Sequence, residues 1–193
     1  MNNKRFNKYT KKEINNMNNG CISFLNNNSI ISFVCNELNI KHSNNKLYLG
    51  KINKKTANEI KKKTGLDLYN YNVILKGDNI RKIIKDHGSK DTEVLRGQIN
   101  VKIKDFALIS EIITGFDELT ISGKTKNNKP VLTFEKTLDS KYYLVEYVSD
   151  KHHSIVLQTM FKHKKKNSVT VLHKYTSGLN TSETVSDTSS YAH

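Results

Sequence analysis

The spacing of apolar residues predicts three helices in the middle of the chain. Residues 79–87 place three isoleucines and a histidine at i, i+3, i+4 and i+7, and Gly88 follows as a helix stop. Residues 54–63 carry Ala57 and Ile60 at helical spacing before Gly65. Asp105 is placed to cap a third helix, rich in isoleucine, that ends at Gly115.

The hydrophobic period then changes from that of a helix to that of a strand. Short β-branched and aromatic runs occupy residues 119–122, 131–137, 141–149 and 154–161, with turn residues between them. Two shorter apolar runs, 47–50 and 72–75, precede them, and the first has the form of a strand. The close spacing of the four later runs predicts hairpins, hence an antiparallel sheet with the helices packed on one face. The expected fold class is α+β.

Composition divides the chain into three regions. Residues 1–43 are rich in asparagine and lysine and are expected to form an N-terminal arm, partly disordered, with one apolar island at 30–38 that forms a short strand or helix. Residues 44–164 are expected to form the folded domain. Residues 165–193 are rich in serine and threonine and are expected to form a solvated C-terminal tail.

The charge balance favours an anionic partner. The chain has 32 Lys+Arg against 18 Asp+Glu, a formal net charge of +14, and nucleic acid is the commonest partner of such a surplus. Only three of these cations are arginines, so an AT-rich coding sequence is the alternative explanation. No run of 18 apolar residues and no signal-peptide pattern occur, and Cys21 and Cys35 are too far apart for a CxxC pair. We expect a protein of a reducing compartment, without a membrane contact.

Two segments near the second helix could carry chemistry. Lys85 and His87 lie at the end of that helix, where the alternative role of the histidine is a partly buried structural group and that of the lysine a solvated charge. Arg96 follows an irregular stretch, 89–95, and precedes a strand-like one, 98–103. Arg96 could clamp a phosphate, or it could form an ion pair with Glu93 or with a helix carboxylate.

Further candidates lie in the expected sheet. Strict alternation would place Thr159 of the last strand on the same face as Ile155, Leu157 and Phe161, and its alternative role is simple β-propensity. Three other side chains could contact a nucleic acid or transfer a proton: His153, Tyr143 and Lys162. The alternative for His153 is a solvated loop position, that for Tyr143 is packing within the sheet, and that for Lys162 is a solvated strand end.

The order of short motifs along the chain resembles that of one nuclease group. The motifs are Leu47-Tyr48-Leu49-Gly50, Lys85-Asp86-His87-Gly88, Arg96-Gly97-Gln98-Ile99, Tyr142-Tyr143 and Gln158-Thr159-Met160-Phe161. Over residues 44–164 they are similar to the phage-borne nuclease domains of the Barnase–EndoU–colicin–RelE-like (BECR) superfamily. This resemblance implies N-terminal helices packed on a four-stranded antiparallel sheet.

The resemblance also implies an activity and a set of site residues. The activity is cleavage of RNA without a metal or other cofactor, through attack by the 2′-OH on the adjacent phosphate. His87 matches the helix-end histidine of the group, Arg96 its arginine after the loop, and Thr159 its last-strand threonine. We expect these residues to be catalytic together with Lys85, and Tyr143, His153 and Lys162 to bind substrate. No metal ligands are expected.

The biological expectation is a toxin-like endoribonuclease of a phage or prophage. It would act on cellular RNA, with tRNA one candidate, in the bacterial cytoplasm, or it would be carried by a virion. An acidic immunity or antitoxin protein is the expected neutralising partner, given the net charge of +14. Members often carry a second histidine where residues 79–82 stand here, and this chain has none there. The alternative is therefore a non-catalytic, basic phage protein that binds nucleic acid or a partner on a decayed nuclease fold.

Overall fold

The computed structural model describes residues 25–165, and the expected arm and tail lie mostly outside this range. Within it the α-helices are α2 (Asn27–Leu38), α3 (Lys54–Thr64), α4 (Gly77–His87), α5 (Lys90–Leu95) and α6 (Ile109–Thr114). The strands are β1 (Lys46–Lys51), β2 (Asn72–Lys76), β3 (Glu118–Lys124), β4 (Pro130–Thr137), β5 (Lys141–Ser149) and β6 (Ser154–His163). Two 3-10 helices, η1 (Ile103–Leu108) and η2 (Asp150–His152), complete the described elements.

The fold is α+β, as expected, but its sheet has six strands instead of four. The strand order is β1-β2-β6-β5-β4-β3, and β3 to β6 form the expected antiparallel meander. The first half of β6 offers a free edge, and β2 occupies it in parallel, with Asn72 opposite Ser154 and Ile74 opposite Val156. β1 then pairs antiparallel with β2. The two short apolar runs near the N-terminus thus extend the sheet.

Two predicted helices have the expected stops. α3 ends at Gly65, whose φ of 77° is a left-handed conformation that glycine adopts without steric cost. α4 ends at Gly88, where a Cβ would collide with the carbonyl oxygen of Ile84. The third predicted helix begins as the 3-10 turn η1 and becomes α6, which ends at Gly115.

Two local predictions were wrong. Residues 89–95 are not irregular, because Lys90–Leu95 form α5, with Asp91 and Glu93 in its first turn where the helix dipole favours acidic side chains. Residues 98–103 do not form a strand, since only Ile99 makes an isolated bridge, to Lys162 of β6.

The folded unit begins before residue 44. The apolar island at 30–38 belongs to α2, whose Ile30 and Val34 are fully buried. α2 packs on η1 and α4, and its buried Glu37 forms an ion pair with Arg81 of α4 across 3.0 Å. α2 therefore belongs to the domain and not to the arm.

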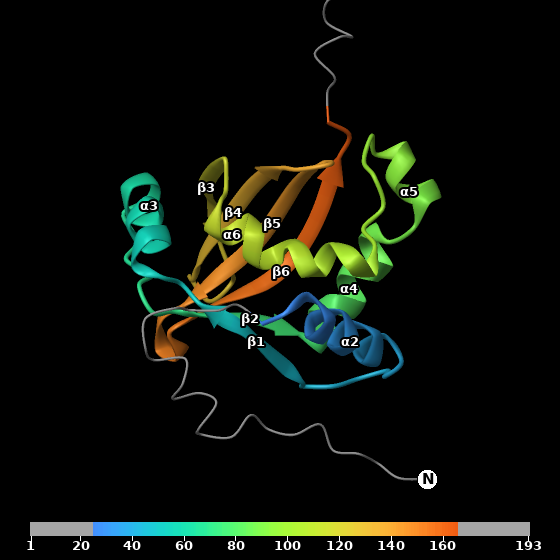
Figure 1. Cartoon of the computed structure of the whole chain (residues 1–193), viewed down its shortest axis with the longest axis horizontal. Coiled ribbons are helices and arrows are strands. Elements are labelled where there is room, and N and C mark those ends of the chain that lie inside the picture. Colours follow the sequence, from blue (N-terminus) through green and yellow to red (C-terminus); the bar gives the residue numbers. More distant parts are fainter. Residues whose placement is uncertain (1–24, 166–193) are drawn as a thin grey trace, which may run out of the picture.

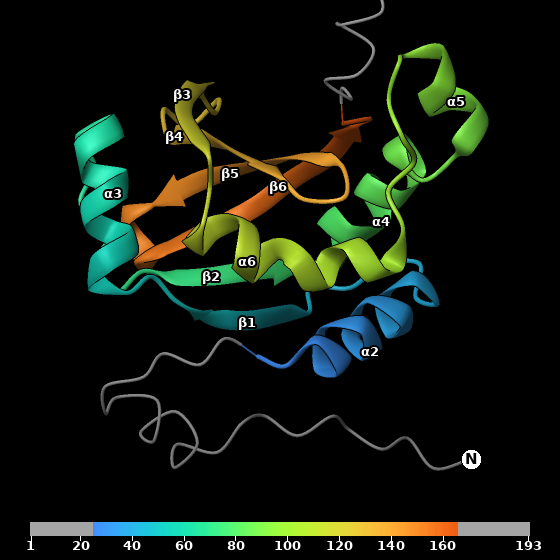
Figure 2. The ribbon, with the colours of Figure 1, turned by 45° about the horizontal axis from the view of Figure 1, so that its top comes forward.

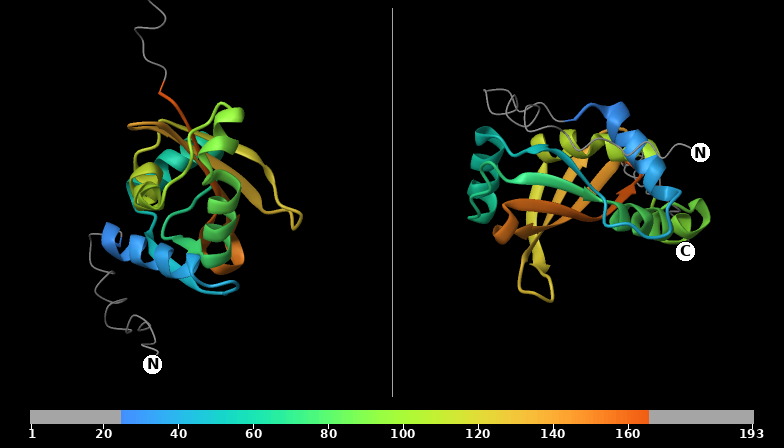
Figure 3. Two further views of the ribbon diagram at one scale, coloured as in Figure 1. Left: turned by 90° about the vertical axis from the view of Figure 1, so that its right-hand side faces the viewer. Right: turned by 90° about the horizontal axis from the view of Figure 1, so that it is seen from below.

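The helices are arranged around one face of the sheet. Figures 1 and 2 show α6 crossing the sheet, while α4 and α5 lie near the end of β6 and α3 stands at the opposite side. The turn of the β3–β4 hairpin projects away from the helices (Figure 3), whereas β3 itself contacts α3. α6 buries Ile109, Ile112 and Ile113 against β4 and β5, whose Phe134 and Leu144 are also fully buried. This helix-covered side is called the inner face below, and the other side is called the outer face.

A β-bulge at Gln158 decides which residues of β6 reach the outer face. Leu157 pairs with Glu146, and both are fully buried on the inner face. Thr159, only two residues later, pairs with Val145 of the outer face. An extra residue in one strand reverses the alternation beyond it. Thr159 and Phe161 therefore face the opposite side from Leu157, and the expectation of strict alternation was wrong.

Candidate active site

The end of α4 and the start of α5 build a buried ionic cluster. The side chain of Glu93 is 0% exposed, and its two oxygens contact different cations. Oε2 lies 3.1 Å from Nδ1 of His87, and Oε1 accepts a hydrogen bond of 2.8 Å from Nη1 of Arg96. The side chain of His87 is 18% exposed and that of Arg96 is 49% exposed. Both are therefore accessible to solvent while they contact the same buried carboxylate.

The backbone around this cluster fixes its geometry. The amide of Val101 donates to the carbonyl of His87 across 2.7 Å, and Nη1 of Arg96 also donates to the carbonyl of Asp86 across 2.8 Å. These bonds satisfy carbonyl groups that the end of a helix leaves without partners. Gly97 has a φ of 68°, which permits the tight turn directly after Arg96.

The contact with Glu93 also determines the tautomer of His87. A carboxylate only accepts hydrogen bonds, so Nδ1 of His87 must carry the proton. In the neutral imidazole Nε2 is then unprotonated, and no hydrogen bond engages it within residues 25–165. This is the arrangement of a general base that a carboxylate orients.

Aromatic side chains connect His87 to the outer face of the sheet. The rings of Tyr143 and Phe161 are stacked, with centroids 4.8 Å apart and planes 7° from parallel. The ring of His87 lies 5.9 Å from that of Phe161. Thr159 shares the outer face of β6 with Phe161 and is partly exposed. Of the expected residues, His87 and Tyr143 therefore lie beside Phe161, Thr159 lies on the same strand face as Phe161, and Arg96 is linked to His87 through Glu93.

A second histidine borders the same rings. His163, at the end of β6, lies edge-on to Tyr143 at 5.5 Å and to Phe161 at 5.9 Å between ring centroids. Its Nδ1 donates to the carbonyl oxygen of Gly97 across 3.3 Å. The turn that follows Arg96 thus also holds His163.

Basic side chains surround the aromatic residues of β5. Lys76 donates to the hydroxyl of Tyr147 across 2.9 Å, and the ammonium of Lys129 lies 5.2 Å from the centre of the same ring. Nearer the ionic cluster, Lys141 lies 5.5 Å from the ring centre of Tyr143. A hydrogen bond with Glu135 raises the pKa of Lys141, which keeps it charged. The outer face thus combines aromatic rings with positive charge.

Two of the expected site residues lie elsewhere. Lys85 is two positions before His87 in α4, which is about 200° around a helix, so the two side chains point in different directions. His153 sits in the turn before β6, with its ring 5.1 Å from Tyr71, at the other end of the strand from Phe161. Seven residues of strand span roughly 23 Å, so His153 is remote from His87.

The expectation that Lys162 contacts substrate was wrong. Lys162 follows Phe161 and points to the inner face, where it is 4% exposed and its Nζ lies 2.7 Å from Oδ2 of Asp105. The hydroxyl of Tyr142 donates to the other oxygen of Asp105 across 3.1 Å. Burial, followed by the hydrogen bond with Asp139, raises the pKa of Tyr142 far above its usual range. A buried lysine needs such a partner, so the ammonium of Lys162 is engaged inside the fold.

Comparison with known proteins gives one match. A family model described as phage-Barnase-EndoU-ColicinE5/D-RelE like nuclease3 covers residues 50–169, which is more than half of the chain. The chain belongs to this nuclease family. No curated protein and no solved structure matches it.

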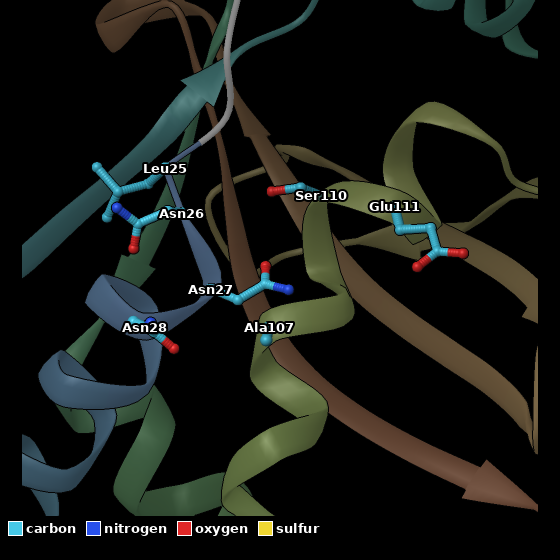
Figure 4. A pocket seen from close by; sticks show the side chains of 7 residues that line it. All are labelled: Leu25, Asn26, Asn27, Asn28, Ala107, Ser110 and Glu111. Atoms are coloured by element: carbon cyan, nitrogen blue, oxygen red, sulfur yellow. The ribbon is translucent and has the colours of Figure 1, made fainter.

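Two hollows of the described residues lie apart from His87. One lies between the start of α2 and α6 and is lined mainly by asparagine amides together with Ser110 and Glu111 (Figure 4). A second lies beside Asp105 and Tyr142. Neither includes His87, and neither combines a histidine with a cation. Residues 25–165 contain no group of three His, Cys, Asp or Glu side chains suited to a metal ion. No helix in this range could cross a membrane.

Sequence reasoning missed three residues of this site. Glu93 was considered only as an ion-pair partner of Arg96, because the helix that aims it at His87 was not predicted. Phe161 and His163 were not singled out, although both follow Thr159 at the two-residue spacing of one strand face. That two-residue spacing could have indicated that they share a strand face with Thr159. The position of the bulge is also needed to tell which face of the sheet this is.

Proposed function

We propose that this member of the phage nuclease family is an endoribonuclease that cuts RNA without a metal. The observation that supports this most is the pair of contacts from buried Glu93 to His87 and Arg96. A base oriented by a carboxylate and a cation for the phosphate then lie within one cluster. RNA carries its own nucleophile beside each phosphate, so a base and a cation supply much of what cleavage needs.

Each residue has a part in the proposed reaction. Nε2 of His87 removes the proton from the 2′-OH, whose oxygen forms a bond to phosphorus while the bond to the 5′ oxygen breaks. Arg96 stabilises the charge that develops on the phosphate oxygens. The hydroxyl of Thr159 orients the substrate, and the rings of Tyr143 and Phe161 offer a surface against which a base can stack. The products are a 2′,3′-cyclic phosphate and a free 5′-OH.

The arrangement of the outer face suggests the form of the substrate. Tyr143, Val145 and Tyr147 alternate along β5 on this face, with lysines at both ends. Stacking on aromatic rings requires unpaired bases, and a basic border follows the phosphates. We therefore propose single-stranded segments of cellular RNA, such as the loops of tRNA, as substrate. Toxin-like action in a bacterial cell and an acidic neutralising partner belong to the same proposal.

The test is incubation of the purified protein with total RNA in EDTA. The wild type and His153→Ala are expected to cut RNA and to leave 2′,3′-cyclic phosphate ends, whereas His87→Ala loses activity by about 10²–10⁴-fold while it remains folded. Substitution of the 2′-OH by hydrogen at the mapped cut position should abolish cleavage there. Salt-sensitive binding of RNA without any scission by the wild type would instead favour the non-catalytic alternative.

A further inference from the structure

His163 is held in the same manner as His87. Nδ1 of His163 donates to the carbonyl oxygen of Gly97, and Nδ1 of His87 donates to the carboxylate of Glu93. Within the described part of the chain, no hydrogen bond engages Nε2 of either ring. Both imidazoles are therefore fixed through one nitrogen and have the other available for proton transfer.

The two histidines also lie beside the same aromatic ring. The centroid of each imidazole is 5.9 Å from that of Phe161, so at most two such lengths separate them. Gly97 follows Arg96 directly, so the loop that supplies the phosphate-binding cation also anchors His163. The bulge at Gln158 places His163 on the outer face together with Thr159.

We propose that His163 is the second proton-transfer group of this site. The inference rests on the proposed function and deepens it. Cleavage of a phosphodiester needs a base for the 2′-OH and an acid for the departing 5′ oxygen. His87, which a carboxylate orients, acts as the base. His163 enters the step as an imidazolium, and its Nε2 gives a proton to the 5′ oxygen as the bond from that oxygen to phosphorus breaks.

Among the histidines of residues 25–165, the remaining three do not offer this role. His42 and His152 are exposed and make no contact with the aromatic cluster, and His153 is at the far end of β6. In residues 79–82 of α4, where members of the group often carry a second histidine and this chain has none, Asn79 donates its amide to the carbonyl of Leu157. The second imidazole thus comes from the last strand and not from the helix.

Two RNA substrates that differ in the leaving atom test the assignment. One is an oligonucleotide with the normal 5′ oxygen at the mapped cut position, and the other carries sulfur there, which departs without being protonated. His163→Gln, His87→Gln and the control His153→Gln are each assayed on both substrates. The ratio of the two rates does not depend on the folded fraction of a preparation, so partial unfolding of a variant does not affect the result.

We expect His163→Gln to cleave the oxygen substrate about 10²–10⁴-fold more slowly than the wild type and the sulfur substrate at nearly the wild-type rate. His87→Gln should be slow on both, and His153→Gln normal on both. In the bell-shaped pH–rate profile of the wild type, His163→Gln should remove the limb that falls at high pH. Equal loss on both substrates, or no loss on either, would overturn the role of His163 while leaving the nuclease function standing. A wild type inactive on both substrates would overturn both proposals.

Discussion

Glu93 and His87 are joined by a contact of 3.1 Å between a fully buried carboxylate oxygen and Nδ1 of a partly exposed imidazole. The two residues belong to different helices, α5 and α4, and are six positions apart. Because the same carboxylate binds Arg96, it couples the orientation of a base to the position of a cation. In the proposed reaction this coupling gives Glu93 the role of a positioning residue.

Replacement of Glu93 by glutamine should therefore impair catalysis more than folding. An amide can also donate a hydrogen bond, so it no longer imposes one tautomer on His87. We expect the cleavage rate of Glu93→Gln to fall by about 10²–10⁴-fold. Asp91→Asn, an exposed change on the same helix, is the control and should keep the wild-type rate. Rates on RNA and thermal unfolding curves of the three proteins check this.

The hydroxyl of Thr159 is expected to contribute a single hydrogen bond to the substrate. Such a bond is worth about 1 kcal/mol, so Thr159→Val should slow cleavage by roughly 5-fold without changing the unfolding temperature. Thr133→Val is the control, because Thr133 lies opposite Val145 on the next strand. Equal cleavage rates for the wild type and Thr159→Val would show that Thr159 contributes only to the stability of the strand and not to cleavage.

Lys76 and Lys129 around Tyr147 should affect RNA binding through charge. Each phosphate contact with a single strand contributes about 0.7 to the slope of the logarithm of the RNA-binding constant against the logarithm of salt concentration. The double variant Lys76→Gln with Lys129→Gln should therefore reduce the magnitude of this slope by about 1.4. Lys54→Gln with Lys55→Gln, two exposed changes on α3, removes the same charge and should leave the slope nearly unchanged. Fluorescence titrations of a single-stranded RNA over a range of salt concentrations measure both. Equal effects of the two pairs would argue for a diffuse attraction.

Lys162 should matter for stability and not for contact with RNA. Lys162→Met leaves Asp105 charged and buried without its cation, which costs about 3–5 kcal/mol in the free energy of unfolding. The exposed Lys164→Met should change it by less than about 0.5 kcal/mol. Denaturant unfolding of the purified proteins gives both values. A fully stable Lys162→Met with weakened RNA binding would contradict the buried pair.

The buried carboxyl of Glu146 should make the free energy of unfolding depend on pH. It is fully buried between Leu132 and Leu157, neither carboxyl oxygen has a hydrogen-bond partner within residues 25–165, and burial raises its pKa from 4.5 to about 8. The folded state thus keeps a proton that the unfolded chain releases above pH 4.5. Its stabilising effect is complete below that pH and is lost as the pH rises toward 8, at about 1.4 kcal/mol per pH unit.

Glu146→Gln removes this titration. Relative to the wild type it should become progressively more stable between pH 4.5 and 8, with no further gain above that range. Glu59→Gln, an exposed change on α3, should follow the wild type at every pH. Urea unfolding at several pH values gives the comparison, and parallel curves for Glu146→Gln and the wild type would show that the carboxyl is not buried as a neutral group.

The sequence alone was sufficient for the elements whose pattern is local. The isoleucine spacing before Gly88 determined α4 and the place of His87 at its end, and alternating runs with turn residues between them determined the strands β3 to β6. A helix face and a hairpin depend on residues close together in the chain, so their periods can be read directly. The motif order likewise pointed to the nuclease family that the family comparison confirmed.

Tertiary structure decided which of these residues meet. One extra residue at Gln158 turned Thr159, Phe161 and His163 to the outer face and left Lys162 to pair with Asp105 inside. Glu93 reached His87 only because a short helix folds back after Gly88. A bulge and a buried ion pair depend on partners that are distant in sequence, and the local pattern of apolar residues contains no information about their register.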